Sequence, residues 1–292
     1  PVTQAGAYRL EATIQVDGED RPWIATNPLY LLQPRSDLLA SPPAAIAANV
    51  QVFRKLPYSE GKPEDANEHT LDLYVPKDKK VFPVLLFLHG DLWRSGDRTR
   101  FTAFGNRFAR AGLGVAIPGY RSAPAPAQIE DAAAAFAWVR KFILKYGGDP
   151  HRIYVGGHSL GGRLAALLAL DPQYLKPHGL SPADIKGVVA LSGLYDARDI
   201  AALGPGDETK RDATPSFRVR TASPPFLIAY CQWDYPALPY RARQLYSALR
   251  KTFVAARLLY VPGENHLSEI VYVWRDDDPI ARAILQMAHP LP

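Results

Sequence analysis

The ten residues 153–162, which read IYVGGHSLGG, constrain the fold of this chain more than any other stretch. An apolar, β-branched run ends in glycines around Ser159 and leads into an alanine- and leucine-rich segment, so the sequence predicts a strand, a tight turn and a helix. A G-x-S-x-G turn needs small residues two positions either side of the serine, because side chains there would meet neighbouring backbone. Such a turn presents a hydroxyl at a helix N-terminus, which makes Ser159 the candidate nucleophile of a nucleophile elbow.

Strand patterns alternate with helix patterns from residue 81 to the end of the chain. Near-continuous apolar runs at 82–88 and 113–117 are typical of strands that are buried on both faces. The spacing of apolar residues over 129–146 predicts an amphipathic helix, which two glycines end before the turn Asp149-Pro150. The pattern predicts an α/β fold with a doubly wound, mostly parallel sheet and a site at the carboxyl ends of its strands.

The first 48 residues differ from the rest of the chain. Residues 8–14 are a candidate strand, but the remainder is predicted to be irregular. Five prolines interrupt it: Pro22, Pro28, Pro34, Pro42 and Pro43. We therefore expect residues 1–48 to form an arm or partial cap without a core of its own, and residues 49–292 to form the catalytic domain. Alternating segments at 50–55 and 70–75, joined by a polar turn, predict an antiparallel start to the sheet.

Composition narrows the possible partners. The 292 residues are 47% hydrophobic, enough for a large core, yet no apolar run approaches the roughly 18 residues of a membrane span. The net charge of +5 comes from 34 basic and 29 acidic residues scattered along the chain, which argues against nucleic-acid binding. The single cysteine, Cys231, is expected to be a buried hydrophobe. A chain that starts at Pro1 is a processed or trimmed product, so we expect a soluble protein, either cytoplasmic or exported after signal removal.

A serine nucleophile needs a base and an acid that orients the base. His266 follows the predicted strand at 257–261, at the same edge of the sheet as Ser159, and the chain order serine, acid, histidine suits this architecture. Asp234, just beyond the apolar run at 226–231, is the best candidate acid. Asp196 is the alternative, with Asp199 behind it. The acidic residues 276–278 follow the histidine and are expected to begin the final helix.

An oxyanion hole requires backbone N–H donors from two places. One is the residue after the nucleophile, Leu160. The other is the loop after the strand at 82–88, where Asp91 and Leu92 are the candidate donors and His89 is expected to orient the loop. The candidate pocket residues are His158, Trp93 and the neighbouring Phe101.

The chain resembles the α/β-hydrolase carboxylesterases, and is similar to the hormone-sensitive-lipase-like and kynurenine-formamidase-like esterases that carry H-G-G-x-W. The supporting landmarks are the segments 89–93 (HGDLW), 119–124 (GYRSAP), 147–150 (GGDP), 157–161 (GHSLG), 191–193 (LSG) and 224–225 (PP), with Asp234 and His266. The resemblance covers the chain from about residue 71 onward. It implies an eight-stranded-type sheet with helices on both faces and a catalytic triad of Ser159, Asp234 and His266. It also implies hydrolysis through an acyl-enzyme without a metal or organic cofactor.

Three functions remain open at this stage. The preferred one is hydrolysis of a small or medium ester substrate; the alternatives are an arylformamidase or other amidase, and a catalytically silent binding protein on the same fold. A lipase is disfavoured, because no long amphipathic lid segment is visible. Asp91 stands where the resembled esterases have a glycine, and we expect its side chain to point away from the oxyanion. Acyl and alcohol specificity and oligomeric state are not predicted.

Overall fold

The computed structural model describes residues 45–60, 69–90, 98–121, 126–196 and 214–289, and the backbone of four strands that lie before residue 32. The chain divides into two compact units, Pro1–Pro42 and Pro43–Pro292. The predicted polar turn at residues 61–68 and three of the expected site residues, Asp91, Leu92 and Trp93, lie outside the described residues.

The N-terminal unit contains two small antiparallel sheets. Strand β1 (Gly6–Tyr8) pairs with β4 (Leu29–Leu31), and β2 (Glu11–Val16) pairs with β3 (Glu19–Ala25). The candidate strand at 8–14 overlaps β1 and β2, but the prediction that the remainder is irregular was wrong at β3 and β4. Pro22 lies within β3, next to a register shift, and a two-stranded sheet consists of edge strands, where a residue without an N–H is tolerated. That these residues act as an arm or cap stays a prediction.

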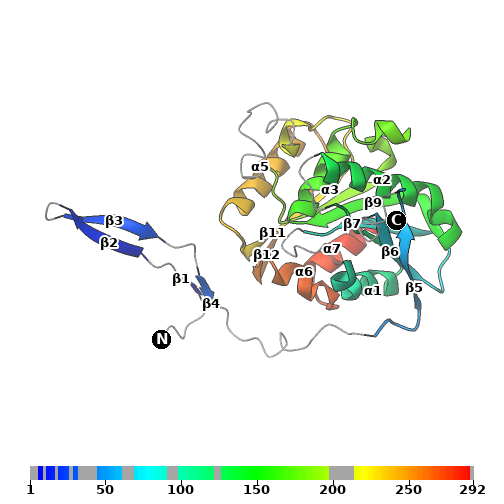
Figure 1. Ribbon diagram of the computed structural model, residues 1–292, viewed down its shortest axis with the longest axis horizontal. Helices are drawn as coiled ribbons and strands as arrows, with labels where there is room; N and C mark the ends of the chain where they lie inside the picture. The colour runs from blue at the N-terminus through cyan, green and yellow to red at the C-terminus, as the bar shows by residue number, and fades with distance from the viewer. Residues whose placement is uncertain are drawn as a thin grey trace. The chain divides into compact units, whose positions relative to one another are not determined.

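The larger unit is built on an eight-stranded sheet with the order β12-β11-β10-β9-β7-β8-β6-β5 (Figure 1). The strands are β5 (Val50–Pro57), β6 (Thr70–Pro76), β7 (Phe82–Leu88), β8 (Gly114–Pro118), β9 (Gly148–His158), β10 (Gly187–Leu191), β11 (Phe226–Trp233) and β12 (Ala256–Asn265). Strand β6 is antiparallel to β5 and β8, and the other neighbours are parallel. The predicted α/β class and antiparallel start are confirmed.

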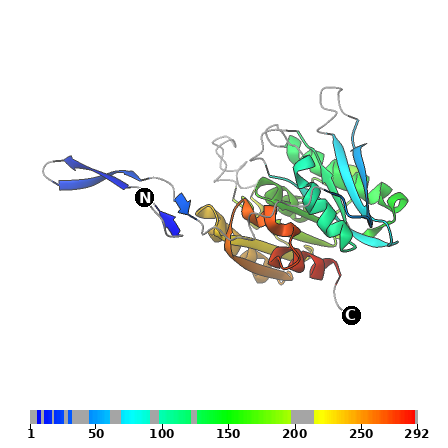
Figure 2. The same cartoon turned by 90° about the horizontal axis from the view of Figure 1, so that it is seen from below.

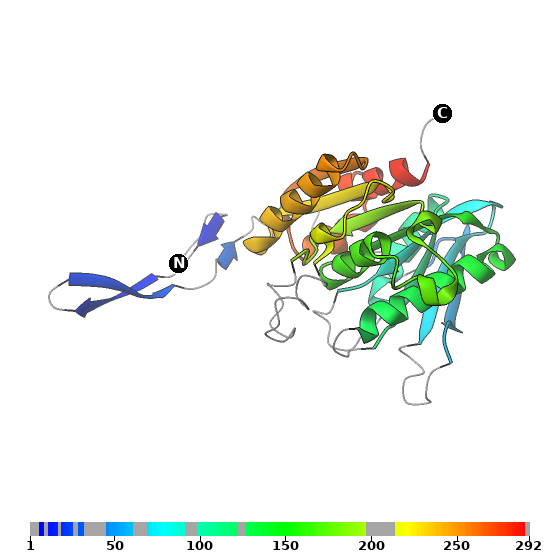
Figure 3. The same cartoon turned by 90° about the horizontal axis from the view of Figure 1, so that it is seen from above.

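Helices cover both faces of this sheet. Helices α2 (Ala127–Phe142), α3 (Leu160–Leu170) and α5 (Ala237–Lys251) pack on one face (Figure 3). Helices α1 (Thr102–Arg110) and α7 (Pro279–Ala288) pack on the other, near the short helix α6 (Ser268–Val271) (Figure 2). Each face therefore buries its own apolar layer, as expected for a sheet with helices on both sides. Within the described residues, no helix combines the length and apolar content needed to cross a membrane.

The turn predicted at Asp149-Pro150 lies inside β9 instead of before it. The helix ends as predicted, with a 3₁₀ turn and a left-handed Gly147 at φ 88°. Strand β9 then pairs with β7 through Gly148 and again through Ile153, so residues 149–152 bulge from the ladder. The Asp149 carboxylate accepts a hydrogen bond from the His151 N–H at 2.8 Å. Turn chemistry is therefore present, but within a bulged strand that tolerates the proline.

Candidate active site

Ser159 stands between β9 and α3 in a strained backbone conformation, with φ 56° and ψ −120°. A Cβ added at Gly157 would collide with the backbone of Gly161, and one added at Gly161 would collide with the Leu88 carbonyl at the end of β7. The spacing of glycines around the serine is therefore required by backbone packing. The turn lies at the carboxyl end of the central strand, as the sequence predicted.

Asp234 and His266 lie beside each other at the same edge of the sheet. Each directly follows its strand, and the pairing of Trp233 in β11 with Asn265 in β12 sets them side by side. An Asp234 carboxylate oxygen lies 2.8 Å from His266 Nδ1. Because a carboxylate only accepts, Nδ1 carries a proton, and in the neutral imidazole Nε2 is then the nitrogen with the free lone pair. His266 Nε2 is buried and has no hydrogen-bond partner among the described residues.

The acid is itself held in place by neutral donors. The Ser192 hydroxyl, at the end of β10, donates to Asp234 Oδ2 at 2.5 Å, and the Tyr235 N–H donates to Oδ1 at 3.0 Å. Sequence reasoning did not assign Ser192 a role. Its position in the sequence could have identified it, because Ser192 follows a parallel strand that neighbours β11 and therefore lies at the same edge of the sheet.

The loop that carries His266 has its own internal bonds. The Asn265 side-chain oxygen accepts from the N–H groups of Leu267 and Ser268, both at 2.9 Å. The Ser268 hydroxyl accepts from the Asn265 N–H at 2.8 Å. These bonds form a compact turn around the histidine, which fixes its backbone next to the acid.

Only part of the predicted oxyanion hole falls within the described residues. Leu160 is the first residue of α3, where a backbone N–H has no acceptor within the helix. His89 is buried and stacks on Tyr120, with ring centroids 4.4 Å apart, and the Tyr120 hydroxyl donates to the His89 carbonyl. This contact fits the expected role of His89 in orienting the loop that follows it. Phe101 packs in the core against Phe87, with ring centroids 5.7 Å apart.

The other candidate acids have different partners. Asp196 is buried and pairs with Arg241 at 2.9 Å, and Asp199 lies outside the described residues. Asp278 caps α7 by accepting from the Ala281 N–H at 2.7 Å, as expected for a residue that begins the final helix. Among these carboxylates, Asp234 is the one that meets the histidine.

A second buried polar group lies behind the histidine. The His158 Nε2 atom is 2.8 Å from the His266 carbonyl oxygen and 3.1 Å from Glu269 Oε1, and the Cys231 thiol donates to Glu269 Oε2 at 2.9 Å. Burial, followed by the charge of Glu269, raises the pKa of Cys231, which keeps it a neutral thiol. His158, His266 and Glu269 form the one metal-ligand-like cluster of the described residues; His158 Nε2 is bound to the His266 carbonyl, and Glu269 Oε2 is bound by the Cys231 thiol.

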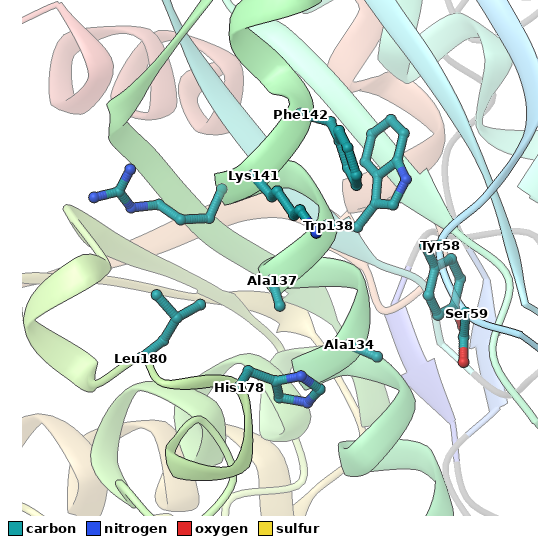
Figure 4. Close-up of a pocket in the computed structure, with 10 residues that line it drawn as sticks. Tyr58, Ser59, Ala134, Ala137, Trp138, Lys141, Phe142, His178 and Leu180 are labelled. Carbon is teal, nitrogen blue, oxygen red and sulfur yellow. The ribbon is translucent and has the colours of Figure 1, made fainter.

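A pocket of about 570 Å³ is lined mainly by residues of α2 (Figure 4). Trp138, Phe142 and Tyr58 contribute aromatic walls, and His178 and Leu180 close one side. None of its lining residues belongs to the predicted site, so it is distinct from the region around Ser159.

This sheet, with a strained serine turn after its central strand and an acid and a histidine after its last two, defines an α/β-hydrolase fold. Residues 71–249 match the BD-FAE family, and the chain belongs to that family. The predicted resemblance to α/β-hydrolase carboxylesterases is confirmed, while placement in the hormone-sensitive-lipase-like subgroup stays a prediction.

Known relatives carry esterase names. The chain is 33% identical to Esterase LipC of Mycobacterium tuberculosis over 67% of this chain and 56% of that protein. It is 27% identical to a probable isoprenylcysteine alpha-carbonyl methylesterase of Oryza sativa over 78% of this chain and 64% of the relative. It thus spans less than two thirds of these relatives. A truncated carbohydrate esterase from gut microbiota shares the fold, with a TM-score of 0.69 at 21% identity over 85% of this chain and 98% of that one.

Proposed function

We propose that this protein is a serine hydrolase that cleaves small to medium carboxylic esters through an acyl-enzyme intermediate. The observation that carries the proposal is the 2.8 Å contact between Asp234 and His266, at the same sheet edge as the strained Ser159 turn. The esterase names of the relatives support the same reaction class.

Each residue has a definite task in this reaction. His266 Nε2 takes the proton of the Ser159 hydroxyl as its oxygen attacks the ester carbonyl carbon. Asp234 keeps the proton on Nδ1 and stabilises the imidazolium that forms. The Leu160 N–H, with a donor from the Asp91 and Leu92 loop, binds the oxyanion.

The intermediate then collapses. The carbon–oxygen bond to the alcohol breaks, and Nε2–H protonates the departing alkoxide, leaving an acyl group on Ser159. Water, deprotonated by His266, attacks the acyl carbonyl carbon; the bond from this carbon to Ser159 Oγ then breaks, the carboxylic acid leaves, and His266 returns the proton to the Ser159 oxygen. No further group is required for the balance of atoms and protons.

Two exposed apolar side chains flank the base. The Tyr235 ring lies 4.8 Å from the His266 ring between centroids and is 52% exposed, and Leu267 is 40% exposed. Apolar surface beside the reacting atoms favours the acyl or alcohol part of an ester. His158 is buried beside His266, and its role as a pocket residue stays a prediction.

The test is hydrolysis of p-nitrophenyl acetate by Ser159→Ala and His266→Ala. Each change is expected to lower kcat by at least about a thousand-fold, because the nucleophile and the base act as one unit. A fluorophosphonate probe should label the unchanged protein at Ser159 and fail to label Ser159→Ala.

Matched controls come from exposed residues of the same types. Ser181→Ala and His178→Ala lie away from the site and should retain full turnover. Unchanged activity in Ser159→Ala, or labelling at another residue, would refute the proposal. Faster turnover of N-formylkynurenine than of short aryl esters would favour the amidase alternative.

A further inference from the structure

His158 and Glu269 form a buried pair that the proposed reaction does not use. His158 is the residue before the nucleophile, at the end of β9, and Glu269 lies in α6, three residues after His266. The exposed fractions of His158 and Glu269 are 3% and 0%. Ionisable side chains are rarely buried this deeply unless other groups pair with them.

The pair holds the backbone of the base. A carbonyl oxygen only accepts hydrogen bonds, so the contact of 2.8 Å to the His266 carbonyl requires that His158 carry a proton on Nε2. The Nε2 atom also lies 3.1 Å from Glu269 Oε1, within ion-pair distance, although Oε1 accepts no hydrogen bond among the described residues. His266 is thus fixed twice, at its ring by Asp234 and at its carbonyl by His158.

The pair also places a negative charge behind the imidazole ring. A Glu269 carboxylate oxygen and a His266 ring nitrogen lie within 4.8 Å of each other, and the rings of His158 and His266 have centroids 4.5 Å apart. Among the described residues, the partners of the carboxylate are His158 and the Cys231 thiol. A carboxylate at this distance attracts a positive charge that forms on the His266 ring.

We infer that His158 and Glu269 are positioning residues for the base: His158 fixes the His266 backbone, and the Glu269 carboxylate, which lies close to both imidazole rings, favours the imidazolium that forms during proton transfer. The inference rests on the proposed function, since it requires that His266 become positively charged during turnover. Interactions that strengthen only in the transition state raise kcat and leave KM nearly unchanged.

The test compares Glu269→Gln, which keeps the shape and removes the charge, with the unchanged protein. We expect kcat for p-nitrophenyl acetate and the rate of fluorophosphonate labelling to fall together by about ten-fold or more, with KM within about two-fold. The matched control is Asp171→Asn, which removes another buried carboxylate, bound by Gln173 and Arg218 near the end of α3. This control should lower Tm and leave kcat per folded molecule unchanged.

A second pair of variants keeps the inference falsifiable if Glu269→Gln folds poorly. His158→Gln retains an N–H that can reach the His266 carbonyl, and His158→Leu does not, so the glutamine variant should recover most of the kcat that the leucine variant loses. Equal kcat in these two variants, or a kcat for Glu269→Gln within about two-fold of the unchanged protein, would overturn the inference.

The unchanged protein separates the two proposals. If it hydrolyses the ester and is labelled at Ser159 while the variants match it, the positioning role fails and the hydrolase function stands. If the unchanged protein does neither, the hydrolase function fails, and the positioning role fails with it.

Discussion

Buried carboxylates have different partners in two parts of the sheet. Asp72, in β6, is bound by two guanidinium groups, Arg54 at 2.8 Å and Arg98 at 3.0 Å. Asp234 accepts from a hydroxyl, a backbone N–H and an imidazole, and Glu269 faces an imidazole and a thiol. A guanidinium is always charged, so it compensates Asp72 permanently. An imidazole changes its charge during proton transfer.

The difference separates a structural role from a chemical one. The ion pairs of Asp72 are the same in the resting protein and during a reaction, so they contribute to the folded state alone. The carboxylates around His266 gain a full counter-charge only when the imidazole is protonated. Their attraction is therefore greatest in the transition state, where it lowers the barrier.

The largest effect on activity is expected for Asp234→Asn. The amide can present an N–H to Nδ1 and favour the wrong tautomer of His266, so kcat should fall by about 10⁴-fold with little change in fold. Ester hydrolysis and circular dichroism measure the two quantities. Retention of more than about a tenth of kcat would show that another acid, such as Asp196, supports the base.

The largest effect on stability is expected for Asp72→Asn. The change removes the carboxylate that the two arginines share, one of them buried, and should lower the free energy of unfolding by about 3–5 kcal/mol. Turnover per active site, titrated with the fluorophosphonate probe, should stay unchanged. A fall in turnover would break the comparison, because it would connect this ion-pair cluster to the reaction.

Asp278 differs from both groups of carboxylates, because it is buried and accepts a hydrogen bond from the Ala281 backbone N–H. Burial raises the pKa of Asp278 to about 6, above its ordinary value of 3.8. The folded state therefore binds this proton more tightly than the unfolded chain, and the stability it contributes is complete below pH 3.8 and is lost as pH rises to about 6.

Asp278→Asn keeps the helix cap and removes this titration. The stability of the variant relative to the unchanged protein should rise by on the order of 1–3 kcal/mol between about pH 4 and pH 7. Urea unfolding of both proteins at pH 4 and pH 7 measures this difference in the free energy of unfolding. A constant difference would mean that Asp278 has the same proton affinity in both states.

The smallest effect is expected for Asp91→Gly, a prediction that rests on the sequence alone. Glycine occupies this position in the H-G-G-x-W esterases that the sequence resembles, so turnover should be kept or raised. A large loss in p-nitrophenyl acetate turnover would give Asp91 a role of its own. Asp72→Asn serves as the control, since it also removes a carboxylate.

Sequence patterns predicted what depends on local periodicity. Strand β7 has the same bounds as the apolar run at 82–88, and the glycines that flank Ser159 correctly predict the turn. The candidate strand at 8–14 overlaps β1 and β2, whereas β3 and β4 were missed because Pro22 and Pro28 argue against a sheet interior, and a two-stranded sheet has no interior. Helix α6 has four residues, too few to display a period.

The partners of the site residues depend on which strands become neighbours. Ser192 reaches Asp234 only because β10 lies next to β11, and Glu269 reaches His158 only because α6 follows a strand on the same half of the sheet. Neither contact corresponds to a residue spacing that could be recognised in the sequence. Chain order together with the predicted strand ends selected His266 and favoured Asp234, with Asp196 as the alternative; both chosen residues follow strands that run further than the sequence predicts.

The contact between the Gly161 position and the Leu88 carbonyl limits how this turn can change over evolution. A side chain that collides with another side chain can be accommodated by trimming its neighbour. A Cβ at Gly161 meets main-chain atoms of β7, which every amino acid shares. No compensating substitution elsewhere removes those atoms, so a genetic screen that starts from Gly161→Ala should return glycine at this position and few or no second-site suppressors.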